Sequence, residues 1–159
     1  MINSSRGFTL LTAVILASVV LALGIALLDI AYKQIVLAST AKNSQYAFYA
    51  ADTGLECGLY YDQQQAQFDY SELASNTISC NNGQSISLIT PPNSSTQDSG
   101  AGVRTTSFDI PCTTGGSSVL AHVTITKATN GATVIYSTGY SSCDPSDARR
   151  IERGLKVTY

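Results

Sequence analysis

The sequence predicts an α+β fold in which one long N-terminal helix packs against an antiparallel β-sheet. Three observations predict it: a continuous apolar run, a proline-free amphipathic stretch after it, and short β-type runs over the rest of the chain. The 159 residues suit one modest domain with an appendage. We divide the chain into a short basic leader (1–7), an apolar segment (8–28), an amphipathic continuation (29–62) and a β-rich head (63–159).

The apolar segment, residues 8–28, contains no charged residue and no proline. A helix rises about 1.5 Å per residue, so this segment spans about 30 Å, the hydrocarbon thickness of a bilayer. The first charges after it are Asp29 and Lys33, an i,i+4 pair suited to the membrane boundary. The segment therefore predicts a transmembrane helix.

The following stretch also lacks proline, so we expect the helix to continue to about residue 61, with a length of about 80 Å. Apolar or small residues recur in it every three or four positions, namely Leu37, Ala41, Ser44, Phe48, Ala51, Leu55 and Leu59. Such a stripe predicts one helix face that lies against the head.

Two further features lie near the end of this helix. Four aromatic residues could form a binding patch, but we expect them in the core: Phe48, Tyr49, Tyr60 and Tyr61. Gly54 and Gly58 either allow another element to approach closely or loosen the helix end. The sequence does not separate these two options.

The head shows β-type runs separated by turn residues. Residues 77–90 predict two strands around an Asn82-Gly83 turn, and Asn130-Gly131 supplies a second tight turn. We expect residues 91–102 to form a polar loop. The remaining strand candidates are 103–110, 119–127, 133–140 and 149–159. In the last of these, Arg153 falls on the apolar face, so we expect it at the rim or paired with a carboxylate.

All four cysteines follow the apolar segment: Cys57, Cys80, Cys112 and Cys143. An even number of scattered cysteines beyond an export signal predicts two disulfides. Three pairings are possible, and the shorter loops favour Cys57–Cys80 with Cys112–Cys143. No two cysteines have the spacing of a redox or zinc motif.

The composition excludes several classes of function. A net charge of −2 and the lack of a basic patch indicate no contact with nucleic acid. The one histidine, His122, has no partner motif, so we predict a hydrogen-bonded strand residue, no cofactor and no enzyme. We also predict no metal site; Asp144 and Asp147 would be the calcium candidates, but Asp-Pro with Ser is also an ordinary turn.

The sequence RGFTLLTAVILASVV, in which a basic leader ends in glycine before a long apolar helix, resembles a type IV prepilin. The segment AFYAADTGLECGLYYD resembles the helix end of minor-pilin-like proteins, and the layout resembles the pilin fold. The resemblance implies that a prepilin peptidase cleaves between Gly7 and Phe8 and N-methylates Phe8. It further implies assembly through Phe8, Thr9, Leu10, Leu11 and Thr12.

The resemblance also implies partners and a location. The partners would be other pilin subunits in a filament, and the ATPase and membrane platform that assemble it. Before assembly the chain would cross the inner membrane once, with its C-terminal domain outside. Afterwards it would belong to a periplasmic or cell-surface filament of the type IV pilus or type II secretion class.

Thr12 departs from the family pattern. The fifth residue after the cleavage site is usually a glutamate that faces the amine of a neighbouring subunit, and a buried ammonium without a counter-charge is costly. The departure favours a minor or tip-located subunit over an ordinary one. The alternative is an ordinary subunit in a filament that balances this charge elsewhere.

Two other readings of the N-terminus stay open. Residues 1–26 could be an ordinary signal peptide, which would leave a secreted, disulfide-bonded binding module. An uncut helix would instead anchor such a module in the membrane. Neither reading makes use of Gly7 and Phe8.

Overall fold

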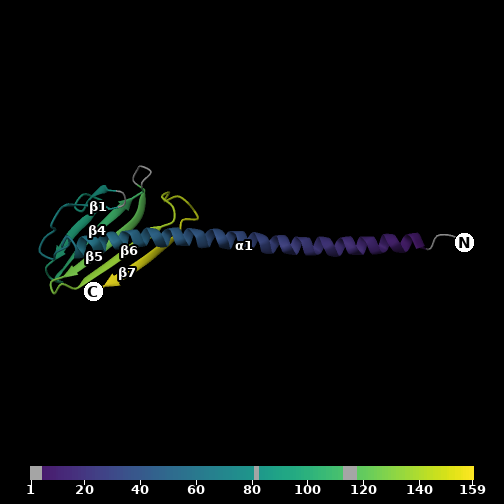
Figure 1. The fold of residues 1–159 in the computed structure, drawn as a ribbon, viewed down its shortest axis with the longest axis horizontal. Coiled ribbons are helices and arrows are strands. Elements are labelled where there is room, and N and C mark those ends of the chain that lie inside the picture. Colours follow the sequence, from purple (N-terminus) through teal and green to yellow (C-terminus); the bar gives the residue numbers. More distant parts are fainter. Residues whose placement is uncertain (1–4, 81–82, 113–117) are drawn as a thin grey trace. The chain divides into compact units, whose positions relative to one another are not determined.

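The computed structural model describes residues 5–80, 83–112 and 118–159, and only the backbone of residues 5–7. Its fold is α+β, as predicted, with one helix and antiparallel sheets (Figure 1). Helix α1 runs from Ser5 to Gln63 without a break. The chain divides into two compact units, residues 1–41 and 42–159, and each unit is described by itself.

Within the described part of the chain, seven strands follow α1 and form two sheets. Their bounds are β1 Thr77–Cys80, β2 Gln84–Ser87, β3 Ser94–Asp98, β4 Val103–Pro111, β5 Val119–Ala128, β6 Thr133–Tyr140 and β7 Glu152–Thr158. Strands β1 and β2 pair alone, and β3 to β7 form a five-stranded sheet in sequence order. Every pairing is antiparallel, because each strand turns back beside the one before it.

The predicted hairpins form. Strands β1 and β2 pair on either side of the expected turn, where Gly83 has a φ of +80°; Asn82 lies outside the described residues. The second hairpin joins β5 to β6, and its Gly131 has a φ of +86°. Positive φ strains residues with a Cβ, so glycine is suited to both positions.

The expectation of a polar loop over 91–102 is wrong, because this stretch contains β3. Its residues Ser94–Asp98 pair in register with β4. Hydroxyl pairs connect the two strands, with Ser94 Oγ 3.0 Å from Ser107 Oγ and Ser95 Oγ 2.9 Å from Thr106 Oγ1. A polar edge strand of this kind has no apolar alternation from which to predict it.

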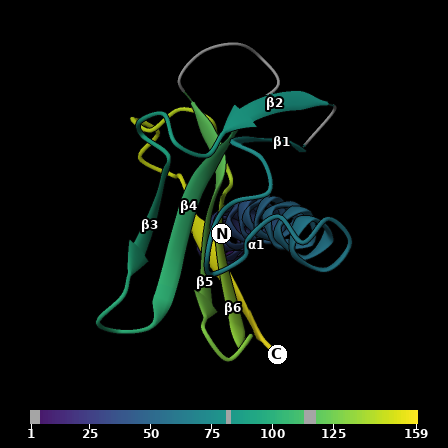
Figure 2. The same cartoon turned by 90° about the vertical axis from the view of Figure 1, so that its left-hand side faces the viewer.

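The second half of α1 lies against one face of the five-stranded sheet (Figure 2). The residues of β4, β5 and β6 that point to this side are buried, among them Phe108, Val123 and Ile135. The β1–β2 pair and the segment after α1 complete the core with Ile78, Ile86, Leu88 and Phe68. The Phe68 ring stacks on the Phe108 ring at 6.2 Å between centroids.

The helix face against the sheet consists of small residues: Ala47, Ala50, Ala51, Gly54 and Gly58. The contact is close, since a Cβ added at Gly139 of β6 would overlap the backbone of Ala47, Ala50 and Ala51. A Cβ at Gly54 would overlap the side chains of Ser137 and Val123. A Cβ at Gly58 would lie 3.3 Å from the Ile135 side chain. Gly54 and Gly58 therefore serve close approach, the first of the options that the sequence left open.

Because small residues occupy this face, the large aromatic side chains of α1 point elsewhere. The expectation that all four aromatic residues are core is wrong for Phe48, Tyr49 and Tyr60, which are 45 to 63% exposed. Tyr61 is partly buried against the core, and its Oη accepts a hydrogen bond from Ser79 N at 2.8 Å. Of the predicted stripe, Ala51, Leu55 and Leu59 pack against the head, Ser44 accepts a hydrogen bond from Arg153, and Phe48 is 45% exposed.

The disulfides are Cys57–Cys80 and Cys112–Cys143, the pairing that the loop lengths favoured. The first connects α1 to β1, and the second connects the end of β4 to the segment between β6 and β7. They close loops with sequence separations of 23 and 31 residues. In the chain-entropy account, loops of this size stabilise a fold by about 3–4 kcal/mol each.

A buried polar cluster holds the end of α1 to the sheet. Asp62 is buried, and its carboxylate accepts hydrogen bonds from Lys127 Nζ at 2.8 Å and from Tyr159 Oη at 2.7 Å. Thr133 Oγ1 is the third donor to this carboxylate, at 3.3 Å. Burial and the bond to Asp62 raise the pKa of Tyr159 to about 12, so it remains protonated and a donor.

Candidate functional site

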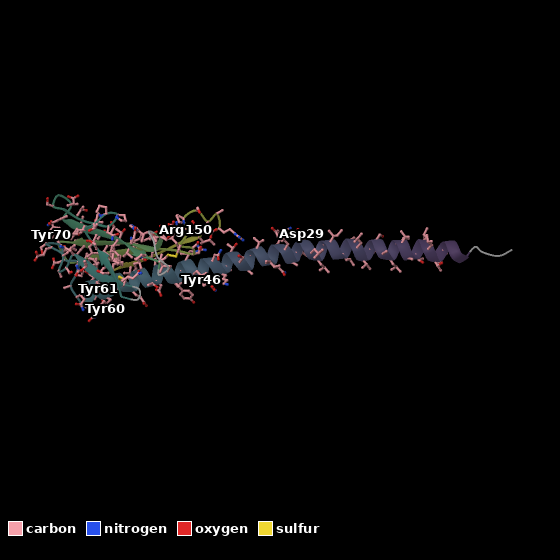
Figure 3. The ribbon with its side chains drawn as sticks, turned by 90° about the horizontal axis from the view of Figure 1, so that it is seen from above. Asp29, Tyr46, Tyr60, Tyr61, Tyr70 and Arg150 are labelled. Atoms are coloured by element: carbon pink, nitrogen blue, oxygen red, sulfur yellow. A yellow bond between two sulfur atoms is a disulfide. The ribbon has the colours of Figure 1, made fainter. Side chains whose placement is uncertain are left out.

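The N-terminal half of α1, residues 5–41, carries the candidate assembly site. Its large apolar side chains from Phe8 to Leu37 are 47 to 73% exposed. Figure 3 shows these side chains along that half of the helix. Among the described helices it is the one long and apolar enough to cross a membrane, and it lies near the N-terminus.

Water is an unfavourable environment for such a surface. The transfer of each large apolar side chain out of water is favourable by about 1.5–3 kcal/mol of free energy, so transfer of the whole segment is favourable by roughly tens of kcal/mol. Backbone hydrogen bonds within a helix are satisfied internally, which makes lipid an acceptable medium. The segment therefore suits either a bilayer or a bundle of apolar helices.

The residues at the predicted cleavage site are described in part. The backbone of Gly7 belongs to α1, and residues 1–4 of the leader lie outside the described residues. Phe8, Thr9, Leu10 and Leu11 are exposed. Thr12 Oγ1 donates to the carbonyl of Thr9 at 3.0 Å and lies 3.2 Å from that of Phe8.

This geometry defines what Thr12 offers to a partner. Its hydroxyl is neutral and bonds to its own helix, so it supplies no negative charge for a neighbouring ammonium. The first carboxylate after the apolar segment is Asp29, which pairs with Lys33 at 2.8 Å in an exposed i,i+4 pair. From Phe8 to Leu28 the segment thus carries no charge.

The head exposes an aromatic face, defined by Tyr46, Phe48, Tyr49 and Tyr60. Tyr46 and Tyr60 are 51% and 54% exposed, and Tyr46 lines a hollow together with Leu120 and Tyr140 of the sheet. Lys42 Nζ lies 5.6 Å from the centroid of the Tyr46 ring. Arg153 is exposed at the sheet rim as expected, but its Nε donates to Ser44 Oγ at 2.8 Å and not to a carboxylate.

The two calcium candidates are both exposed, and both bond to the loop itself. Asp144 Oδ1 accepts from Ser146 N and Oγ, and Asp147 Oδ1 accepts from Arg149 N. The bonds from Ser146 lower the pKa of Asp144. Within residues 5–80, 83–112 and 118–159, no three His, Cys, Asp or Glu side chains are grouped for a metal ion.

His122 has a partner that the sequence did not reveal. Its Nδ1 lies 2.5 Å from Asp109 Oδ1, and this hydrogen bond raises the pKa of the imidazole. The two residues face each other across β4 and β5. The pairing depends on strand register, and alternation within each strand is the one sequence signal that could have placed both on one sheet face.

No protein-family model matches the chain, and no curated protein or solved structure matches it.

Proposed function

We propose that this chain is a structural subunit of a filament of the type IV pilus or type II secretion class. In this proposal, residues 1–7 are a leader that a prepilin peptidase removes, and the apolar segment polymerises with its counterparts in other subunits. An ATPase and a membrane platform transfer the subunit from the inner membrane into the filament. Residues 42–159 form the part outside the membrane.

One observation carries the proposal: an exposed apolar segment directly follows the Gly7–Phe8 sequence. A segment that is apolar on all sides is compatible with lipid before assembly and with a helix bundle afterwards. Two disulfides fit an oxidising compartment outside the cytoplasm. A single-pass anchor alone would also be apolar, but it would not need the cleavage sequence.

We further propose a minor or tip position, on the basis of Thr12. A subunit in the middle of a filament must balance the charge of a neighbouring N-terminal amine, and a neutral hydroxyl bonded to its own helix cannot do so. A subunit with no neighbour above it has no such requirement.

The mature N-terminus, measured by mass spectrometry on protein from its native membrane, tests the proposal. We expect a species that begins at Phe8 and carries one added methyl group. A start near Leu27 would establish signal-peptide cleavage, and an intact Met1 would establish a plain anchor; either result contradicts the filament proposal.

A pair of glycine variants separates processing from general damage to the helix. Gly7→Val places a side chain at the proposed cleavage site and should leave the leader attached. Gly24→Val is the matched control, because a Cβ at Gly24 meets no other atom within 4 Å. The proposal predicts normal processing of the Gly24 variant, and equal processing of both variants would contradict it.

A further inference from the structure

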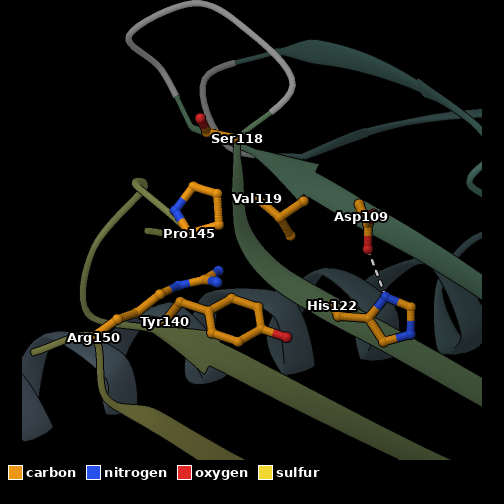
Figure 4. A pocket seen from close by; sticks show the side chains of 7 residues that line it. All are labelled: Asp109, Ser118, Val119, His122, Tyr140, Pro145 and Arg150. Atoms are coloured by element: carbon orange, nitrogen blue, oxygen red, sulfur yellow. Dashed lines mark hydrogen bonds and ion pairs between the residues drawn. The ribbon is translucent and has the colours of Figure 1, made fainter. Parts of the chain in front are cut away.

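A cavity of about 310 Å³ lies on the sheet face opposite α1 (Figure 4). It is lined by Asp109, Ser118, Val119, His122, Tyr140, Pro145 and Arg150. Alternation along the strands explains the placement: Ala121 and Val123 are buried on the helix side, so His122 between them faces the other way. Gly139 faces α1, and Tyr140 next to it faces the cavity.

Arg150 is the cation best placed to receive a ligand. Its guanidinium carbon lies 3.8 Å from the centroid of the Tyr140 ring, and its Nε donates to Ser142 O at 3.2 Å. These two contacts hold the guanidinium in one orientation. Its two terminal nitrogens form no hydrogen bond with any residue that the structure describes. Two parallel donors of this kind match the geometry of a carboxylate.

Arg150 gives one part of the cavity wall a positive charge. Among the described residues of the lining, Asp109 is the one carboxylate, and its Oδ1 already bonds to His122 Nδ1. That hydrogen bond raises the pKa of the His122 imidazole and engages the Asp109 carboxylate with His122 rather than with Arg150. Glu152 is paired with Tyr140 across β6 and β7 but does not line the cavity.

The remaining wall supplies apolar surface and hydroxyl groups. Val119, Pro145 and the Tyr140 ring can contact a carbon skeleton, and Ser118 and Tyr140 carry hydroxyls. The volume is at the lower end of the range for small-molecule sites, about 300–1,000 Å³. This volume fits one sugar acid or one acylated amino acid.

We propose that this cavity binds a small organic carboxylate, with the ligand's carboxylate held by Arg150 and its carbon skeleton against Tyr140 and Val119. Every lining residue lies between residues 109 and 150, so the proposal does not depend on the filament proposal. Ser118 and Tyr140 carry the hydroxyl groups of the cavity wall, whereas the ring nitrogens of His122 lie 2.5 Å from Asp109 Oδ1 and 3.4 Å from Thr124 Oγ1.

Titration of the full chain in detergent tests this site, with the His122 ring resonances as the probe, since His122 is the only histidine. The titrants are D-glucuronate for a sugar acid, N-acetylglycine for an acylated amino acid, and D-glucose as the neutral control. We expect at least one of the two carboxylates to shift the resonances saturably, and glucose to bind at least about tenfold more weakly. Failure of both carboxylates, or equal binding of glucose, would overturn the proposal.

Neighbouring arginines provide a matched pair of variants. Arg150→Gln should weaken carboxylate binding at least about tenfold, since a hydrogen bond to a charged group is lost. Arg149→Gln removes the same charge at an exposed residue outside the cavity wall and should leave binding unchanged. Equal losses in both variants would show a general charge effect and overturn the assignment.

A second variant guards against misfolding. If Arg150→Gln lowers the unfolding temperature, Val119→Phe provides the test, because it fills the cavity without a change of charge. Loss of binding in Val119→Phe supports the cavity as the site. Retained binding overturns it.

Discussion

The two halves of α1 belong to one continuous helix but differ in which side chains they bury. Residues 5–41 carry large apolar side chains that stay exposed on every side. Residues 42–63 bury a face of alanine and glycine against the sheet and leave the aromatic face outside. Hydrophobicity alone therefore does not tell which residues of this helix are core. The small side chains are buried because they allow the helix and sheet backbones to meet.

The two halves of α1 also differ in their charged pairs, since one pair is buried and the other is exposed. The buried pair gives the largest expected effect on stability. Lys127→Ala leaves the buried Asp62 without its cation, and we expect a loss of about 3–5 kcal/mol in the free energy of unfolding. Lys33→Ala breaks the exposed pair with Asp29 and should change stability little. Urea unfolding of both variants measures the difference, and equal effects would contradict the distinction between the halves.

A charge in the apolar segment should affect membrane insertion and not the head. Val19→Lys places an ammonium near the middle of the segment, and we expect insertion to become less favourable by about 3 kcal/mol. Carbonate extraction of membranes measures the inserted fraction, with Val19→Leu as the control. The unfolding temperature of the head should not change, and a large shift would show that the segment also stabilises the head.

Because α1 and β6 are in close contact at Gly139, we expect that a methyl group added there destabilises the fold. Gly139→Ala adds a Cβ that overlaps helix backbone, so we expect a loss of about 1–3 kcal/mol from overpacking. Gly24→Ala adds the same atom to open space in the other half and should not destabilise the head. Thermal unfolding of the two variants tests this prediction, which fails if Gly139→Ala is neutral.

The smallest expected effect is the pH dependence of the Asp109–His122 pair. Its bond raises the folded-state pKa of His122 above 6.5, so the pair stabilises the fold fully below about pH 6.5. That contribution is lost as pH rises through the folded-state pKa. An NMR titration of His122 should give a pKa above 6.5, and Asp109→Asn should lower it. A pKa at or below 6.5 in the unmodified chain would show that the pair has no such effect.

Local patterns were sufficient for much of the head. Two glycine-containing turns and β-type runs between turn residues predicted the hairpins and four strands of the large sheet, and the shorter loops favoured the disulfide pairing that forms. Strand β3 was not predicted, because it is held to β4 by pairs of hydroxyl groups and not by apolar residues. The Asp109–His122 pair was not predicted either, because cross-strand neighbours depend on the register between segments that are distant in the sequence.

The sequence by itself determined the apolar segment, its length and the absence of charge within it, since these are properties of consecutive residues. It also determined that a proline-free helix continues past that segment. Only the tertiary structure decided which face of the helix meets the sheet, because a glycine in β6 and small residues in α1 must coincide in space. The partners of Asp62, and the arginine, tyrosine and histidine that meet at one cavity, likewise come from distant positions whose proximity is set by folding.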